Sequence, residues 1–300
     1  MAVNRLSQLV RGSLLTILIM LANWSYAEDI FAEHSLRVGF YARAFPDFSA
    51  EDLEISVKLL SEEIGKDNGI ATTVTVFTDI ALMRKEFEQG KINFAVASTL
   101  QLANDFDDAL LADGFRLVLS SDRSDSLLVL TRKNEGLDNF KPLRGKKLAL
   151  VEFDPVADLY IDFLARSEFH KSYQAAFKLM PREKKANQII LKLFFGQADV
   201  ICVYQNAYRL ATELNPQLMS KLQIIAQLDG IPQGAGLFNK KTPAEFREQV
   251  IALALKLDSH ARGQQLLQLF KADKAVRSTL ADLAGTKLLY SAYKKLNKHK

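Results

Sequence analysis

The chain has 300 residues, of which 48% are hydrophobic, and a formal net charge of +4. This length and hydrophobic content allow one large domain or two lobes with substantial cores. The 39 basic and 35 acidic residues nearly balance, which argues against a nucleic-acid-binding surface. The single cysteine, Cys202, excludes an internal disulfide, and its apolar neighbours predict a buried side chain.

Residues 1–27 have the pattern of a cleavable secretory signal. Arg5 and Arg11 form a basic start without acidic residues, and the run from Leu14 to Ala22 is apolar and uncharged. Ser25-Tyr26-Ala27 places small residues at the two positions that a signal peptidase reads, so we expect cleavage after Ala27. The apolar run is shorter than the roughly 20 residues that cross a bilayer. The sequence therefore predicts export to the periplasm.

The first half of the mature chain alternates between strands and helices. Strands are predicted over 36–41, 71–77 and 92–97. The helices between them start at Ser49, in a capping-box-like pattern, and at Thr78. Strands and helices in alternation are typical of a parallel sheet.

The same alternation starts again at about residue 143, with a strand and then helices over about 155–167 and 185–195. Two segments of the two halves match closely. In each, a helix ends at a glycine, Gly90 or Gly196, and then Asn93 or Asp199 precedes an apolar strand. One unit therefore occurs twice, which favours two α/β lobes of similar construction.

Two polar breaks, one within 115–130 and one over 229–238, fit two crossings between the lobes. On this interpretation the first lobe is discontinuous and consists of residues 28–127 plus 230–300. The second lobe is residues 128–229. The expected fold class is α/β, with each lobe a mainly parallel sheet flanked by helices.

Ligands of open α/β sheets lie beyond the carboxyl ends of the strands, and two facing lobes bring these ends into one cleft. We therefore expect a small-molecule site among polar side chains that follow predicted strands. Structural alternatives are a helix cap for Ser98, Thr99 or Asp154, a solvated charge for Arg43 and a core rim for Tyr41. The candidate ligand-binding residues are Tyr41, Arg43, Ser98, Thr99, Ser124, Asp154, Asp158, Tyr204 and Gln205.

Catalytic and metal-binding patterns are missing from the sequence. It has no Gly-x-Ser-x-Gly elbow and no Gly-x-x-x-x-Gly-Lys loop, and Ser291-Ala-Tyr-Lys294 fits a Ser-x-x-Lys pattern by chance. The four mature histidines lack metal-ligand spacing. The sequence predicts a binding protein without catalytic residues, metal or cofactor, and an exported hydrolase is the less favoured alternative.

Five motifs in order resemble the type II periplasmic solute-binding proteins, and within them the phosphate, phosphite and phosphonate-binding family of ABC transporters. They are the strand around Gly39, Gly90-Lys-Ile-Asn93, Leu143-Arg-Gly-Lys-Lys147, Gly196-Gln-Ala-Asp199 and Ile231-Pro-Gln-Gly234. The resemblance implies a two-lobed type II periplasmic-binding-protein fold that closes on a small polar solute and delivers it to a membrane permease. The alternative is a sensory protein that presents its ligand-bound form to a membrane receptor kinase. In both cases we expect a monomer.

The chain departs from this family after Asp154-Pro155. The resemblance implies a Ser-Thr-Ser-Gly-type run at this point, whose hydroxyl and N–H groups hold an anion at a helix start. Val156-Ala157-Asp158 stands there instead, so the hydroxyls are lost and a carboxylate is added. Because Asp158 would repel an anion if it faced the cleft, we expect a cationic or hydroxyl-bearing ligand at least as much as an oxyanion.

Overall fold

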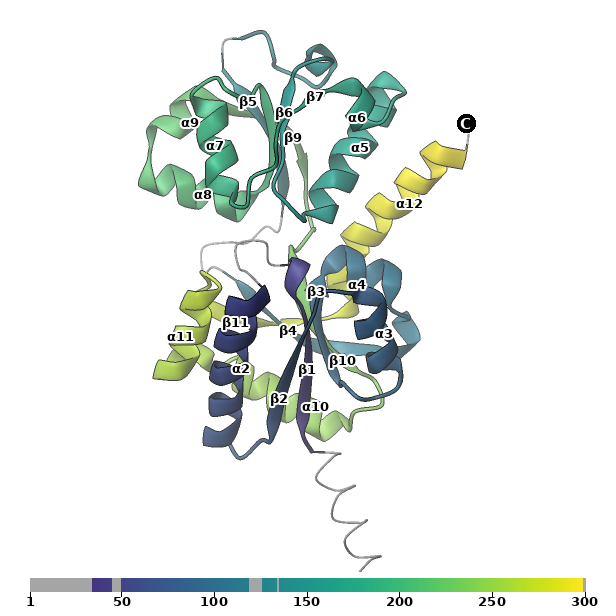
Figure 1. The fold of residues 1–300 in the computed structure, drawn as a ribbon, viewed down its shortest axis with the longest axis vertical. Coiled ribbons are helices and arrows are strands. Elements are labelled where there is room, and N and C mark those ends of the chain that lie inside the picture. Colours follow the sequence, from purple (N-terminus) through teal and green to yellow (C-terminus); the bar gives the residue numbers. More distant parts are fainter. Residues whose placement is uncertain (1–33, 45–49, 119–125, 134, 299–300) are drawn as a thin grey trace, which may run out of the picture.

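A computed structural model describes residues 34–44, 50–118, 126–133 and 135–298. The predicted signal peptide, the helix cap at Ser49 and the candidate Ser124 lie outside these residues. Two separate sheets, each flanked by helices, form two lobes that stand one above the other in Figure 1. We call the lobe with the six-stranded sheet the first lobe and the lobe with the five-stranded sheet the second lobe.

The first lobe has the strand order β11-β4-β10-β3-β1-β2. Helices α2, α10 and α11 cover one face of its sheet, and α3 and α4 cover the other. The strands are β1 (Leu36–Tyr41), β2 (Thr72–Phe77), β3 (Phe94–Ser98), β4 (Leu111–Val118), β10 (Gly234–Asn239) and β11 (Lys274–Ser278). The helices are α2 (Ala50–Asp67), α3 (Ile80–Glu88), α4 (Thr99–Asp105), α10 (Ala244–Ala254) and α11 (Ala261–Leu269), with short 3-10 turns η1 (Ala42–Ala44), η2 (Asp108–Leu110), η4 (Leu257–Ser259) and η5 (Leu280–Leu283).

The second lobe has the strand order β7-β6-β8-β5-β9. One face packs on α5 and α6, and the other on α7, α8 and α9. Cys202 is fully buried in this sheet, as predicted. The strands are β5 (Leu127–Arg132), β6 (Lys147–Ala149), β7 (Lys178–Leu179), β8 (Val200–Tyr204) and β9 (Leu222–Leu228). The helices are η3 (Lys141–Leu143), α5 (Pro155–Phe169), α6 (Tyr173–Ala176), α7 (Ala186–Phe194), α8 (Gln205–Leu214) and α9 (Gln217–Lys221).

The expected α/β class with two helix-flanked sheets is confirmed, but the sheets are mixed rather than mainly parallel. β1 pairs in parallel with β2 and β3, and β6 pairs in parallel with β7 and β8. The strands next to the crossovers pair antiparallel: β10 with β3 and β4, β11 with β4, and β5 with β8 and β9. The antiparallel strands arise because the chain leaves and re-enters each lobe at the same end of its sheet.

The repeated unit predicted from the sequence makes the same contacts in both lobes. The Asn93 N–H donates to the Arg37 carbonyl at 2.9 Å, and the Asn93 side-chain oxygen accepts from the Arg37 N–H at 2.7 Å. The Asp199 N–H donates to the Lys147 carbonyl at 2.9 Å, and its carboxylate accepts from the Lys147 N–H at 2.9 Å. Each side chain therefore fixes the start of a neighbouring parallel strand.

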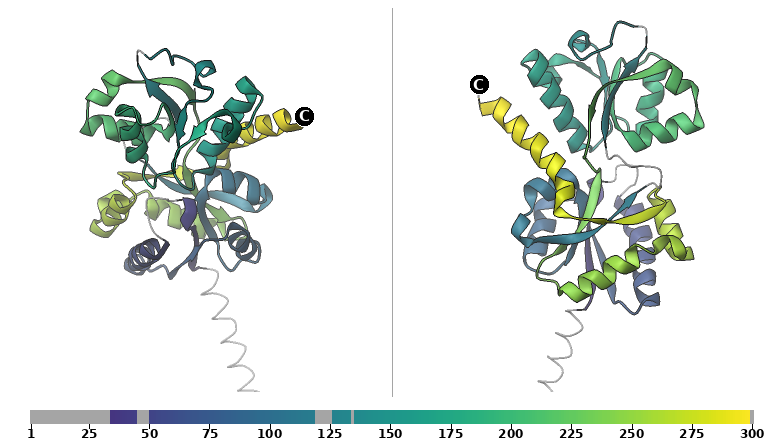
Figure 2. Two further views of the ribbon diagram at one scale, coloured as in Figure 1. Left: turned by 45° about the horizontal axis from the view of Figure 1, so that its top comes forward. Right: turned by 180° about the vertical axis from the view of Figure 1, so that it is seen from behind.

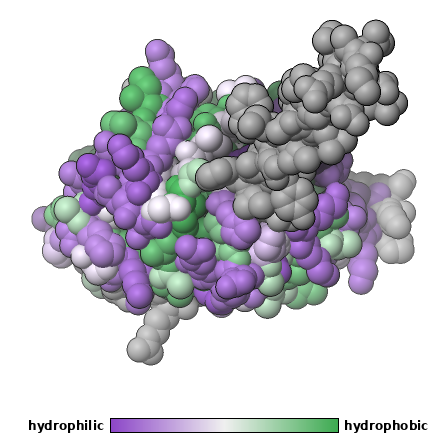
Figure 3. Space-filling view, turned by 90° about the horizontal axis from the view of Figure 1, so that it is seen from below, coloured by the Kyte–Doolittle hydropathy of each residue, from purple (hydrophilic) through white to green (hydrophobic). Residues whose placement is uncertain are grey.

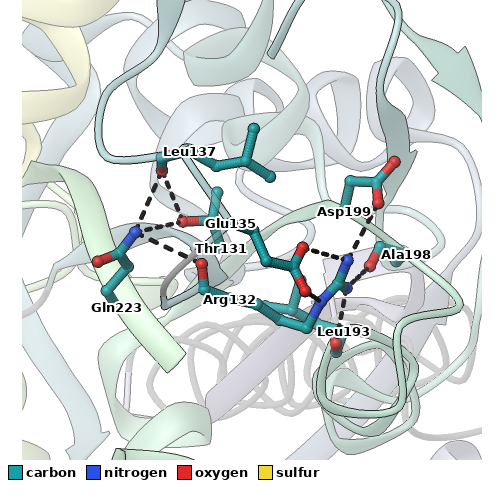
Figure 4. A network of polar contacts seen from close by, with 8 residues as sticks. All are labelled: Thr131, Arg132, Glu135, Leu137, Leu193, Ala198, Asp199 and Gln223. Carbon is teal, nitrogen blue, oxygen red and sulfur yellow. Dashed lines mark hydrogen bonds and ion pairs between the residues drawn. The ribbon is translucent and has the colours of Figure 1, made fainter. Parts of the chain in front are cut away.

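A polar network extends this contact in the second lobe (Figure 4). The Arg132 guanidinium donates to Asp199 at 3.2 Å, to Glu135 at 2.6 Å and to the carbonyls of Leu193, at 2.9 Å, and Ala198. Nearby, the Gln223 amide donates to the Leu137 carbonyl at 3.3 Å. Arg132 ends β5 and Asp199 precedes β8, so this network lies at the end of the sheet that is remote from the first lobe.

The two crossovers meet at the edge of the second lobe. Leu127 and Leu228 are paired where β5 and β9 meet. Just outside this pair, the Ser126 hydroxyl donates to the Asp229 carboxylate at 2.6 Å, and the Gln227 amide donates to the same oxygen at 2.6 Å. These hydrogen bonds from Gln227 and Ser126 lower the pKa of Asp229. The crossovers therefore enter the second lobe as a joined pair.

The C-terminal helix α12 (Ala284–Lys298) contacts both lobes (Figures 1 and 2). Its start packs on the second crossover, because a Cβ on Gly285 would lie only 2.2 Å from the Gly230 carbonyl oxygen. Its outer half packs on α5, where the Tyr293 hydroxyl donates to Asp162 at 2.7 Å and Leu289 joins the second-lobe core. The sequence interpretation, which assigned 230–300 to the first lobe, did not predict this second contact.

Among the described residues, no helix combines the length and the apolar content that crossing a membrane requires. On the lower face of the first lobe, hydrophobic side chains lie in small groups between hydrophilic ones (Figure 3). Exposed apolar side chains of this kind are common on protein surfaces.

Candidate functional site

A cavity of ≈ 650 Å³ lies between the lobes and continues into the first lobe. The second lobe contributes the carboxyl ends of β6 and β8 and the starts of α5, α7 and α8. This placement follows the rule that ligand sites of α/β sheets lie beyond the carboxyl ends of strands. The polar lining residues are Ser61, Asn68 and Thr72 in the first lobe, together with Arg116, Ser126, Asp154, Lys185, Asn187, Tyr204, Gln205, Asn206, Gln233 and Lys271.

Three helix starts in the second lobe favour a ligand that carries hydrogen-bond acceptors. The first N–H groups of a helix have no partner within the helix, and they carry the positive end of the helix dipole. At α5 the Asp154 carboxylate accepts from the Ala157 N–H at 3.0 Å, so Asp154 is a helix cap as well as a lining residue. At α7 and α8, lining residues with amide or ammonium groups, Lys185, Asn187, Gln205 and Asn206, lie in the first turn or at the cap.

The carboxyl group of Asp154 has an unusually high pKa. Its pKa is raised from 3.8 to about 6, mainly because burial disfavours the charged form; the Ala157 N–H opposes this rise and the nearby Asp158 adds to it. The charge of this part of the cavity therefore changes in a mildly acidic range.

Arg43 of the first lobe and Phe153 of the second lobe are in contact, and neither lines the cavity. The Arg43 guanidinium carbon lies 5.6 Å from the centroid of the Phe153 ring, which is a cation–π geometry. The Phe153 side chain is 54% exposed, and its backbone is left-handed with φ of 52°. A bulky residue in this conformation is strained, so the turn between β6 and α5 holds the ring beside Arg43 against a local preference.

Three of the nine predicted residues, Asp154, Tyr204 and Gln205, line the cavity. Tyr204 ends β8 and is largely buried, and Gln205 begins α8. The Gln205 N–H donates to the Ser126 carbonyl at 2.9 Å, which links this helix start to the first crossover. The repeated unit predicted the end of β8 correctly, because the strand that begins after Asp199 ends at Tyr204.

The predicted residues of the first lobe lie elsewhere. Tyr41 is buried in the first-lobe core, and this burial raises the pKa of its hydroxyl. Ser98 caps α4 by accepting from the Gln101 N–H at 3.3 Å, as the structural alternative predicted. The Thr99 hydroxyl donates to the Pro232 carbonyl at 2.8 Å and accepts from Thr286 of α12 at 2.9 Å. The side chains of Tyr41, Ser98 and Thr99 do not line the cavity.

Asp158 is engaged within the second lobe. Its two carboxylate oxygens each accept from the Arg182 guanidinium at 2.9 Å, and Arg182 also donates to the Val151 carbonyl at 2.8 Å. Asp158 does not line the cavity. The repulsion of an anion that the sequence suggested is therefore offset by a neighbouring cation.

Sequence reasoning missed Lys185, Asn187 and Gln233. Lys185 and Asn187 start a helix that was predicted, but the pattern does not show that this start faces the first lobe. Gln233 lies in the Ile231-Pro-Gln-Gly234 motif, which was noted only for its resemblance. All three are polar residues beside a helix start or a crossover, and this position in the sequence could have identified them.

Among the described residues, no group of three or more His, Cys, Asp or Glu side chains is arranged to hold a metal ion. Burial raises the pKa of the Cys202 thiol well above its usual value, and the side chain is enclosed in the sheet. The cavity therefore offers hydrogen-bonding and ionic contacts to a ligand.

The fold agrees with that of solved binding proteins. The binding-protein component of an ABC phosphonate transporter from Pseudomonas aeruginosa is 13% identical, with a TM-score of 0.59 over 88% of this chain and 87% of that one. PhnD1 from Prochlorococcus marinus, in complex with methylphosphonate, is 15% identical, with a TM-score of 0.59 over 89% and 99% of the two chains. A Xanthomonas citri protein bound to ATP is 12% identical, with a TM-score of 0.60 over 89% and 99%. These TM-scores, over nearly the whole of each chain, show a shared type II periplasmic-binding fold.

No curated protein sequence matches the chain. A family model does match it over residues 43–283, with the description "ABC transporter, phosphonate, periplasmic substrate-binding protein". The match covers most of the chain and includes both lobes and both crossovers. The chain therefore belongs to the family of periplasmic substrate-binding proteins of ABC phosphonate transporters.

Proposed function

We propose that this protein captures a small polar solute between its two lobes in the periplasm and delivers it to the permease of an ABC-type importer. Residues 1–27 are removed on export, and the mature chain acts as a monomer. Its first lobe is residues 28–127 plus 230–300, and its second lobe is residues 128–229. The observation that carries the proposal is the cavity whose polar lining comes from both lobes.

Capture works by a shift between open and closed forms. Each lobe alone supplies part of the polar lining, so a ligand that binds both lobes favours the closed form by the sum of these contacts. The Ser126–Asp229 hydrogen bond keeps the two crossovers together at the second lobe. Opening and closing must then rearrange the contacts of the second crossover, where the start of α12 packs on Gly230.

The polar contacts to the ligand come chiefly from the second lobe. Asp154, Tyr204 and Gln205, together with Lys185, Asn187 and Asn206, contribute amide, hydroxyl, carboxyl and ammonium groups to one wall. The methylphosphonate bound to PhnD1 makes alkylphosphonates the first ligands to test. Because the hydroxyl run after Asp154-Pro155 is absent, amino acids and small cations belong in the same panel.

Thermal unfolding of the purified mature protein with this panel tests the proposal. A true ligand at 100 times its Kd should add about 2.7 kcal/mol to the free energy of unfolding. Lys185→Met should reduce this gain, whereas Lys184→Met, an exposed neighbour that does not line the cavity, should leave it unchanged. If no phosphonate, other oxyanion, amino acid or cation stabilises the protein, solute capture is wrong.

The partner is tested by capture on the ligand-bound protein. Membranes that contain the permease of the same transporter should bind the ligand-bound form more tightly than the ligand-free form. Selective binding to a receptor kinase ectodomain would instead support a sensory role and contradict delivery to an importer.

A further inference from the structure

The cavity has an apolar arm inside the first lobe, between its sheet and helices α2, α10 and α11. This arm belongs to the same continuous cavity as the polar cleft, and most of the cavity wall is apolar. Its side chains come from one face of the sheet and from the helices that cover it. The apolar arm is lined by Val38 and Phe40 of β1, Val96 of β3, Phe115 of β4, Val57 of α2 and Val250 of α10. The polar side chains of Ser61, Asn68 and Thr72 also belong to its wall.

Central strands normally bury their inward-facing side chains completely when helices cover the sheet. Val96 of β3 and Phe115 of β4 lie on the face of the sheet that α2, α10 and α11 cover, and both side chains are only partly buried. Ser61 and Ile64 on the inner face of α2 are also only partly buried. The helices therefore do not close on the middle of the sheet, and a gap remains where close packing is the rule.

An empty gap of this kind destabilises the protein, because the apolar atoms that line it have no packing partners. Engineered apolar cavities in proteins stay dry and bind apolar molecules of matching size. The arm follows β1 from Leu36 to Phe40, a length of about 13 Å at the rise of a β-strand. This equals an extended alkyl chain of about ten carbons.

The polar end of the cavity is mainly basic. Arg116, Lys185 and Lys271 line it, against the single carboxylate of Asp154, and the starts of α5, α7 and α8 add positive dipole ends. A ligand that fills the whole cavity therefore has an anionic head and an uncharged tail.

We propose that the ligand is a single-chain anionic amphiphile, with its head at the starts of α5, α7 and α8 and its alkyl chain in the apolar arm. This inference rests on the proposed solute capture and adds the chemical class of the solute. A carboxylate head and a phosphonate head share the required chemistry.

Titration calorimetry on the mature protein with alkylphosphonates and alkanoates from one to twelve carbons tests the inference and compares the two heads. Each buried methylene group should raise the affinity about fourfold, up to about ten carbons. An alkanol of the same length should bind at least tenfold more weakly than the preferred anion. Affinity that does not depend on chain length would overturn the amphiphile and leave solute capture standing, whereas an alkanol that binds equally well would overturn the anionic head.

Filling the arm gives a second test. Ser61→Phe should weaken the ten-carbon ligand at least 50-fold and leave the one-carbon ligand unchanged, whereas Leu59→Phe on the exposed outer face of α2 should change neither. Because Ser61→Phe fills a gap, it should also leave the melting temperature unchanged or raise it. Ala254→Leu provides the same measurement from α10. If both variants lower the melting temperature markedly, the arm has no room for a chain and the inference is wrong.

Discussion

The guanidinium of Arg43 in the first lobe lies over the ring of Phe153 in the second, with 5.6 Å between the guanidinium carbon and the ring centroid. The ring reaches this place through a strained left-handed backbone. The contact joins the two lobes independently of the crossovers. It therefore bears on how readily the lobes separate.

This contact should contribute measurable coupling between the lobes. In a double-mutant cycle with Arg43→Met and Phe153→Leu, thermal unfolding should give a coupling free energy of about 0.5–1 kcal/mol. Phe153→Gly removes both the ring and the backbone strain, so it should destabilise the protein less than Phe153→Leu. Strictly additive effects of the two substitutions would show that the ring and the cation do not interact.

Asp154 should make stability depend on pH in a defined direction. Its pKa is about 6 in the folded protein and near 3.8 when unfolded, so the folded state holds this proton more tightly. Its contribution to the free energy of unfolding therefore falls as the pH rises from about 4 to about 6. Above that range the charged form costs about 3 kcal/mol.

Asp154→Asn should remove this cost, because an amide still caps α5 without carrying a charge. The variant should exceed the parent in free energy of unfolding at pH 7.5 by up to about 3 kcal/mol and match it near pH 4. Urea unfolding across this pH range measures the difference, with Asp79→Asn at the exposed cap of α3 as the control. A difference that stays constant with pH would contradict a raised pKa.

Because Asp199 and Asn93 make the same contact with a neighbouring strand, two different substitutions of Asp199 should lower the free energy of unfolding by different amounts. Asp199→Ala leaves the Lys147 N–H and part of the Arg132 guanidinium without an acceptor, and should lower the free energy of unfolding by about 2 kcal/mol. Asp199→Asn installs the amide that Asn93 uses in the first lobe, so it should lose less. Chemical denaturation measures both, and an equal or larger loss for the asparagine variant would refute the equivalence.

The hydrogen bond between Tyr293 and Asp162 should hold the outer half of α12 on the second lobe. Asp162 is only 7% exposed and also accepts from the Arg166 guanidinium and the Tyr173 N–H. Tyr293→Phe should therefore lower the free energy of unfolding by about 1 kcal/mol. Tyr290→Phe is the matched control, since the Tyr290 hydroxyl has no hydrogen-bond partner among the described residues. Equal effects of the two variants would argue against the contact.

The predicted cleavage after Ala27 would remove Trp24, which is the only tryptophan of the chain. The exported protein should therefore show tyrosine fluorescence alone, and its intact mass should begin at Glu28. Tryptophan emission from purified periplasmic protein would contradict the signal-peptide prediction.

The sequence predicted the local elements well where a helix or strand has clear ends. The glycines at 90 and 196 end helices with φ of 73° and 75°, and the apolar runs after them form β3 and β8. Tyr204 and Gln205 follow β8 into the cleft, as this unit predicts. Ser98 and Thr99 follow β3 in the same way, but a cap and the contact of Thr99 with α12 occupy their hydroxyls. Tertiary packing of this kind leaves no pattern in the local sequence.

The remaining site residues depend on contacts between distant segments. Lys185 lines the cavity because of where α7 starts relative to the first lobe, and Gln233 because the second crossover passes the cleft. The apolar arm was also hidden from the sequence. A helix with an apolar stripe predicts burial, and only the fold shows that the stripe of α2 stands away from the middle of the sheet.

The position of β10 has a consequence for the order in which the chain folds. β10 lies between β3 and β4 in the first-lobe sheet, yet it is synthesised after the whole of the second lobe. The second-lobe sheet, in contrast, is built from one continuous stretch and has all its strands once residue 228 has emerged. As the chain crosses the membrane from its N-terminus, β4 must wait without either of its neighbours and β3 without one of them, while the later lobe completes its own sheet. The exported intermediate therefore exposes three unpaired strand edges, two on β4 and one on β3, which is where aggregation begins and where a periplasmic chaperone would have to act.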